Sequence, residues 1–453
     1  MAEAIKMGGG SVLKTDKIGY YSCKEGSIKA GTPVEFCVEH ELLNSTPIQL
    51  PILHTSSNYS SGSMQCVTLD DGRIVLAYTG AQAIDTYVAL INIQENGQIE
   101  LISITDAIQI NLRYDGVGAI CAKNNKVFIN CSSKLLTVIV NNDNTLSYSI
   151  YDYPEITVSN YTTSIYVKTL IALSDTKILV NGYAIPQSRR YYYSLCILEI
   201  ESNTLKSVAN VLLHSTYTTN DYNAALALTP LKQKLTFLSQ HRADNSGINP
   251  LSVIVIDENL STITIESKYA YPFFNIVTYS GYENRSFIYG RYSGGTSGGT
   301  PETFATLPYD KNKISKRPTA GSFYTGDDGA YGTLLWGRHI QDNIYATTIS
   351  SNSNTAPSPT LNIFYLKDDV MHILDGGVSV YTFSPSTNLM NDNIMLVCKK
   401  YDTIIITVFR WYSPYMYYQS IKINIKVKKA ESIVDGFAKN KITTDVKKPV
   451  YIL

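Results

Sequence analysis

The side chains with the most evident binding chemistry in this sequence are tyrosine and tryptophan rings close to arginine. They gather in four segments, 189–193, 269–274, 289–292 and 410–418, each in or near a variable loop. A Tyr or Trp ring offers a flat apolar face with a hydrogen-bonding edge, which suits both sugar rings and protein partners. Some of these rings should only pack between strands. Our candidate ligand contacts are Arg190, Tyr192, Tyr271, Tyr292, Trp411, Tyr412 and Tyr415.

Catalytic and metal-binding patterns are absent from the sequence. The 6 histidines are far apart, and none belongs to an HExxH or GxSxG motif. The 7 cysteines are scattered without metal-ligand spacing, so we expect no metal and no cofactor. Two carboxylates could hydrolyse a glycosidic bond, but the available loop acids are better explained as turn formers: Asp115, Asp221, Asp327 and Asp328. We therefore expect no catalytic residues.

Charge and hydropathy exclude several classes of partner. The 38 Lys and Arg residues equal the 38 Asp and Glu residues, so no net charge attracts nucleic acid or an anionic membrane. No stretch approaches the roughly 20 apolar residues of a membrane span. The first 10 residues lack the apolar core of a signal peptide. We expect a protein made in the cytoplasm without a signal peptide, and no membrane insertion.

The composition is that of a β protein. Tyr is over-represented, with 35 of 453 residues, and Ile, Val, Thr, Ser and Asn are abundant. β-Branched and aromatic residues fit a pleated surface, while Asn, Ser and Gly close turns.

One unit recurs along the chain: an apolar strand, a tight polar turn, a second strand, a variable loop, a third strand and an Asn-rich turn into a fourth. The residues that end the first turn of each unit are 53, 51, 57, 51, 58 and 60 positions apart: Arg73, Lys126, Lys177, Lys234, Arg285, Asn343 and Thr403. A period of about 55 residues with four strands is typical of a β-propeller.

The prediction is therefore an all-β fold, a β-propeller of about seven four-stranded blades. A ring of six is the alternative, since the last three units are less regular. The domains expected are an N-terminal attachment segment at 1–46, the propeller at 47–429 and a C-terminal β element at 430–453. The segment 48–54 is expected to close the ring. The two end segments share a strand, turn and Pro-Val layout, so we expect them to form one small β attachment element.

The ends also carry a resemblance. Residues 1–11, MAEAIKMGGGS, and the closing segment ESIVDGFAK through Val450-Tyr451-Ile452 resemble the ends of tail-fibre and baseplate-associated proteins of clostridial (Firmicutes) phages and phage-tail-like bacteriocins. The closing segment departs from that pattern at Thr443-Thr444, where a Gly-rich turn is usual.

The resemblance implies a structural, receptor-binding protein of a virion or tail-like particle. Its partners would be other tail or baseplate proteins and a host cell-surface glycan or protein, with no nucleic acid. The alternative function is a glycan-degrading enzyme, a glycoside hydrolase or lyase, on the same fold. A third reading is a cellular propeller that serves as a scaffold for protein partners.

Overall fold

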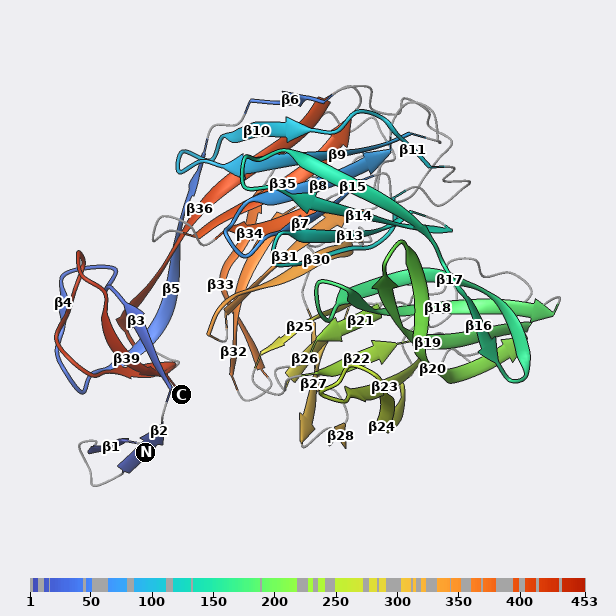
Figure 1. The fold of residues 1–453 in the computed structure, drawn as a ribbon. Coiled ribbons are helices and arrows are strands. Elements are labelled where there is room, and N and C mark those ends of the chain that lie inside the picture. The colour runs from blue at the N-terminus through green and yellow to red at the C-terminus, as the bar shows by residue number, and fades with distance from the viewer. Residues whose placement is uncertain are drawn as a thin grey trace.

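The protein is built from β-strands (Figure 1). The computed structural model describes residues 3–6, 12–15, 17–43, 46–50, 64–79, 85–110, 117–131, 133–187, 190–217, 227–230, 235–240, 249–271, 277–282, 285–290, 303–310, 313–314, 319–322, 332–342, 344–351, 360–367, 370–379, 394–398, 404–412, 415–431 and 434–452. Every regular element in these ranges is a strand. They contain no helix that is long and apolar enough to cross a membrane.

Seven sheets of four or more strands occupy the described residues, and we call them blades one to seven in chain order. Blade one contains β7 (Met64–Thr68), β8 (Ile74–Thr79), β9 (Asp85–Ile93), β10 (Ile99–Ile104) and β11 (Ile108–Gln109). Blade two contains β12 (Ile120–Lys123), β13 (Lys126–Cys131), β14 (Lys134–Val140) and β15 (Leu146–Asp152). Blade three contains β16 (Glu155–Val158), β17 (Tyr161–Ala172), β18 (Lys177–Gln187), β19 (Arg190–Glu201) and β20 (Thr204–Tyr217).

Blades four to six repeat this meander. Blade four contains β21 (Ala227–Pro230), β22 (Thr236–Gln240), β23 (Asn249–Ile256) and β24 (Ile263–Tyr271). Blade five contains β25 (Val277–Tyr282), β26 (Arg285–Gly290), β27 (Thr303–Asp310), β28 (Lys313–Ile314) and β29 (Thr319–Ser322). Blade six contains β30 (Gly332–Gln341), β31 (Ile344–Ser351), β32 (Thr360–Lys367) and β33 (Val370–Ser379).

Blade seven joins the two ends of the chain. Its first three strands are β34 (Ile394–Cys398), β35 (Ile404–Tyr412) and β36 (Tyr415–Lys429), and the N-terminal strands β5 (Pro33–Leu42) and β6 (Ile48–Gln49) pair with β36. The sheet continues through β37 (Gly436–Ala438) and β39 (Lys448–Ile452) to β3 (Ile18–Tyr21). Beside it, β4 (Ser27–Ile28) pairs with β38 (Ile442–Thr443), and near the N-terminus β1 (Glu3–Lys6) pairs with β2 (Val12–Thr15).

The innermost strands of the blades form a closed ring. Contacts run from each innermost strand to the next and return from the last to the first: β7, β12, β17, β21, β25, β30, β34 and β7 again. This cyclic arrangement of meander sheets confirms the all-β propeller fold predicted from the repeat. Radial repetition of this kind leaves only short, protected sheet edges between the blades.

N-terminal residues pair with two separate stretches of β36. Six residues of β5 pair with Asn424–Lys429 of β36. Of the segment expected to close the ring, Ile48 and Gln49 pair with Met416 and Tyr415, and 51–54 lie outside the described residues. The six residues paired with β5 lie beyond the stretch of β36 that pairs with β35, which ends at Ile423, so β5 and this part of β36 continue from the blade toward the end domain. The domain bounds expected at residues 46 and 429 remain predictions, because β5 lies in one continuous sheet with both β36 and the end-domain strand β37.

We call the strands β3, β4, β37, β38 and β39 the end domain, which contains residues from both chain ends. Its core is continuous with that of blades six and seven: Phe36 in β5 lies 4.9 Å, ring to ring, from both Tyr21 of the end domain and Tyr365 of blade six. The Tyr21 hydroxyl also donates a hydrogen bond to Asp342 at the end of blade six. Burial and this carboxylate raise the pKa of Tyr21 well above its usual value, so the hydroxyl stays protonated.

Each blade has two chemically different ends. Because neighbouring strands are antiparallel, the tight turns after the first and third strands lie at one end, which we call the turn face. The opposite end is the loop face, which contains the starts of the first and third strands and the ends of the second and fourth. Gly72 and Asn124 in first turns and Gly97 and Asn144 in third turns have positive φ, which explains why these turns use Gly and Asn.

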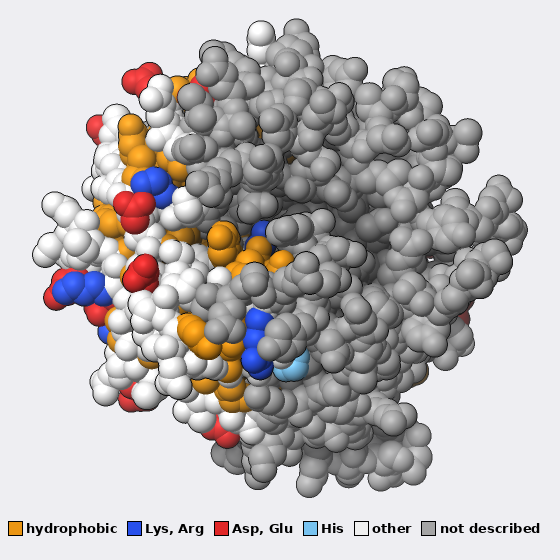
Figure 2. All heavy atoms as spheres, turned by 90° about the vertical axis from the view of Figure 1, so that its right-hand side faces the viewer, with side chains coloured by type: hydrophobic (Ala, Val, Ile, Leu, Met, Phe, Trp, Pro, Cys, Tyr) orange, Lys and Arg blue, Asp and Glu red, His pale blue; other side chains and the backbone are white. Residues whose placement is uncertain are grey.

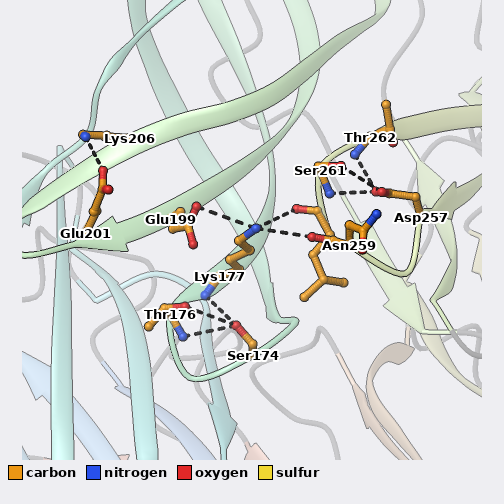
Figure 3. A network of polar contacts seen from close by, with 11 residues as sticks. Ser174, Thr176, Lys177, Glu199, Glu201, Lys206, Asp257, Asn259, Ser261 and Thr262 are labelled. Atoms are coloured by element: carbon orange, nitrogen blue, oxygen red, sulfur yellow. Dashed lines mark hydrogen bonds and ion pairs between the residues drawn. The ribbon is translucent and has the colours of Figure 1, made fainter.

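Polar contacts between these turns hold adjacent blades together. The Lys177 ammonium, from the first turn of blade three, donates to the carbonyls of Asn259 and Leu260 in blade four at 3.4 and 3.3 Å, and lies 3.6 Å from Glu199 (Figure 3). In the same way Arg73 of blade one donates to Asn144 of blade two. The basic residue that ends the first turn therefore reaches the third turn of the following blade in both pairs.

Candidate ligand-binding face

The described sequence-predicted contact residues lie on the loop face. Arg190 and Tyr192 are at the start of β19, Tyr271 ends β24, Trp411 and Tyr412 end β35, and Tyr415 begins β36. Tyr292 lies outside the described residues. The end domain, in contrast, adjoins the turn face, because β37 pairs with Pro33 and Val34 at the beginning of β5, next to the last residue of β36.

The ring brings some of these residues together and separates others. Tyr412 and Tyr415 are register partners across the β35–β36 hairpin, with Trp411 opposite Met416. Blade three carries Arg190 and Tyr192, and its outer strands contact β24, the strand of Tyr271. Blade seven is separated from these two blades around the ring, so the candidates form two groups on one face.

In blade three the side chains show which residues can meet a ligand. The Arg190 guanidinium carbon lies 5.2 Å from the Tyr192 ring centroid, and Arg190 Nη2 donates to Ser215 Oγ at 3.1 Å. Tyr192 itself is only 2% exposed and belongs to the blade core. Its ring therefore supports Arg190 and does not offer a free face, which corrects its predicted role as a direct contact.

Blade three is longer than its neighbour, and the additional length lies on the loop face. Strand β18 has 11 residues, whereas β13 in blade two has 6. The first turns of these blades are at the same level, because Asn124 Nδ2 donates to Asp175 Oδ1 at 2.8 Å. Five additional residues at about 3.3 Å each give a projection of about 16 Å. In Figure 1 the ends of β17 and β18 extend to the right beyond the other blades.

We call this projection the blade-three extension: residues 161–166, 183–187, 190–193 and 214–217. It exposes two tyrosines that the sequence analysis did not select, Tyr161 at 37% and Tyr166 at 48%. They precede the segment that the repeat identified as the first strand of the third unit. The sequence signal for these exposed tyrosines was the segment YTTSIY, a run of tyrosines and threonines with few aliphatic residues.

Figure 2 looks onto the loop face. Over its described part, apolar side chains form several patches, and Lys, Arg, Asp and Glu side chains are scattered among them with no dominant sign of charge. This pattern agrees with equal numbers of acidic and basic residues in the sequence. The described part of this face is therefore a mixed apolar and polar surface.

The titratable side chains of the described residues can be compared with what a metal site or a reactive thiol needs. Among them, no three His, Cys, Asp or Glu side chains come close enough to hold a metal ion. Burial raises the pKa of Cys131 and of Cys196 to about 12, so both thiols stay protonated at neutral pH. The loop acids considered in the sequence lie outside the described residues: Asp115, Asp221, Asp327 and Asp328.

Comparison with known proteins gives similarity of fold alone. No protein-family model matches the chain, and no curated protein matches its sequence. A copper-bound fungal alcohol oxidase is similar over 90% of this chain and 92% of its own, at 11% identity and a TM-score of 0.47. An oligogalacturonate lyase in complex with manganese is similar over 87% of this chain and 98% of its own, at 11% identity and a TM-score of 0.44. A protein from Lactobacillus plantarum is similar over 67% of this chain and 82% of its own, at 8% identity and a TM-score of 0.42.

Proposed function

We propose that this protein is a structural and receptor-binding component of a phage tail or tail-like particle. In this proposal its end domain attaches it to other tail or baseplate proteins, and its loop face binds a glycan or protein on the surface of a bacterial cell. The assignment to a particle rests on the resemblance of residues 1–11 and of the closing segment to tail-protein ends.

The main support for this proposal is that the attachment and binding surfaces lie on opposite faces of the ring. Both chain ends meet in the end domain at the turn face, where β3 pairs with β39. The candidate contacts Arg190, Trp411 and Tyr415 lie at the opposite face of the ring. A particle holding the end domain would therefore leave the loop face free to meet a cell.

The end domain also has an edge strand that suits attachment to another protein. Strand β3 is the last strand of its sheet, and its alternate residues Ile18 and Tyr20 are 39% and 64% exposed. An edge strand with exposed apolar side chains is a suitable site for pairing with a strand of another protein.

Labelled full-length protein added to clostridial cells and to their purified cell-wall polysaccharide tests the proposal. We expect saturable binding to the cells and no sugar released from the polysaccharide. The variants Trp411→Ala and Tyr412→Ala should weaken binding, whereas Tyr20→Ala, in the end domain, should leave it unchanged.

Release of sugar fragments would instead support the glycan-degrading alternative, and absence of binding to every strain tested would refute the receptor-binding role. The genomic neighbourhood gives an independent check, because tail sheath, tube and baseplate genes should flank the coding sequence.

A further inference from the structure

The blade-three extension contains the same three-part arrangement twice. In the first unit the exposed ring of Tyr166 stacks on Tyr183, with ring centroids 5.2 Å apart and planes 19° apart, and Lys168 Nζ lies 5.9 Å from the Tyr183 centroid. Tyr183 is only 5% exposed. An exposed ring therefore rests on a buried ring, and a cation lies over that buried ring.

The second unit uses different residues in the same roles. Tyr161 is exposed and lies 6.3 Å, ring to ring, from the buried Tyr192; the planes are 54° apart, so these rings are tilted and not stacked, and Arg190 lies over Tyr192. Tyr161 and Tyr166 are five residues apart in β17, and side chains of a strand alternate between its two sides. The two units therefore lie on opposite sides of β17 and would contact separate segments of a ligand.

The backbone fixes the position of the first unit. Tyr166 is the register partner of Tyr183, and a β-bulge follows between Val167 and Thr169. Opposite Val167 lies Gly182, where an added Cβ would be 2.4 Å from the Tyr166 carbonyl oxygen. The absence of a side chain at Gly182 therefore allows the close approach that holds Tyr166 over Tyr183, and a preorganised ring loses little entropy on binding.

The charge of the extension is one-sided, although the protein as a whole is neutral. Its residues, YTTSIY, YAIPQ, RYYY and HSTY, include Arg190 and no Asp or Glu, and Lys168 follows two residues after the first segment. Among the described residues, the carboxylates next to the extension in register or in the chain are Glu155, the register partner of Ser164, and Asp152, which pairs with Lys134 at 2.6 Å. This local excess of positive charge favours an anionic ligand.

We propose that the blade-three extension binds an acidic polysaccharide, with Tyr161 and Tyr166 stacking on sugar rings and with Arg190 and Lys168 pairing with the carboxylate groups of the polymer. Flat apolar faces match the apolar faces of sugar rings, and the cations supply the preference for acidic over neutral sugars. The inference rests on the proposed function, because it names the surface and the ligand class through which a cell would be recognised.

Isothermal titration calorimetry with the full-length protein at physiological salt tests whether the extension binds acidic polysaccharide. The two matched probes are carboxymethyl-dextran and unmodified dextran. We expect binding of carboxymethyl-dextran at least about tenfold tighter than binding of dextran. Each of Tyr161→Ala and Tyr166→Ala should weaken binding about threefold or more, and the double variant about tenfold or more, as expected for lost ring contacts.

Tyr148→Ala is the matched control, because Tyr148 is 47% exposed on the outer strand of blade two and lies outside the extension. Lys168→Gln should reduce the preference for the charged polymer. Equal affinity for both polymers, no binding of carboxymethyl-dextran, or tyrosine variants that bind like Tyr148→Ala would each overturn the inference. Binding of cells that survives the double variant would overturn only this inference, whereas polymer binding without binding to any cell would overturn only the receptor role.

Discussion

Asn130 connects two blades inside the core, and its removal gives the sharpest test of how the ring is held together. This side chain is 4% exposed. Its Nδ2 donates to the Val167 carbonyl of blade three at 2.8 Å, and its Oδ1 accepts from the Tyr153 hydroxyl at 3.0 Å. Burial raises the pKa of Tyr153 well above its usual value, so the hydroxyl remains a donor throughout the accessible pH range.

The substitution Asn130→Ala removes both hydrogen bonds and leaves a carbonyl and a hydroxyl buried. At about 1 kcal/mol for each lost bond, with an additional penalty for unpaired buried partners, the free energy of unfolding should fall by about 3 kcal/mol. An unfolding entropy of about 2.1 cal/mol/K per residue gives about 1 kcal/mol/K for 453 residues. The unfolding midpoint should therefore fall by about 3 °C.

Differential scanning fluorimetry with two comparison variants measures this effect. Tyr153→Phe removes one bond and should lower the midpoint by about 1 °C. Asn142→Ala changes an exposed turn residue and should have almost no effect. A midpoint for Asn130→Ala within about 1 °C of that for Asn142→Ala would refute the role of Asn130 as a link between blades.

Three further outcomes follow from other parts of the molecule. Lys177→Met should lower the unfolding midpoint by about 1 °C, because it removes contacts to two carbonyls of the next blade. The control Lys134→Met breaks an exposed ion pair and should leave the midpoint unchanged. Equal midpoints for the two variants would argue against the contact between turns. The Ser261 backbone N–H holds the pKa of Asp257 below its usual value. The ionised carboxylate therefore stabilises the fold at pH values above the pKa that Asp257 has in the unfolded chain, and this contribution is lost as the pH falls. Asp257→Asn should therefore show a shallower loss of stability below about pH 4 in acid titrations followed by fluorescence, and an unchanged slope would contradict this. Cys196, whose pKa burial raises to about 12, should resist iodoacetamide at pH 8 until the protein unfolds, as mass spectrometry would detect.

The repeating unit could be predicted from the sequence, because that information is local. Alternating apolar residues mark strands, and Gly72, Asn124 and Asn144 mark turns that need a positive φ. The unit boundaries at Arg73, Lys126 and Lys177 coincide with the first turns of blades one to three. A period of about 55 residues was then sufficient to predict four-stranded blades and a propeller.

The pairing between the two ends of the chain could not be read from the sequence. The pairing of β5 with β36 joins residues almost 400 positions apart in the chain, and no local pattern encodes such a partner. Strand β5 pairs with Asn424–Lys429, beyond the stretch of β36 that pairs with β35, whereas Ile48 and Gln49 of the expected segment pair with Met416 and Tyr415 inside blade seven.

The candidate surface was likewise only partly readable from the sequence. Tyr-rich segments predicted aromatic contacts, but burial separates the rings, since Tyr192 is 2% exposed and Tyr166 is 48% exposed. That difference arises because both sides of β19 pack into hydrophobic cores, while the start of β17 projects beyond the neighbouring blade. Residue type thus determined which chemistry was available, and the length and packing of blade three decided which rings meet the solvent.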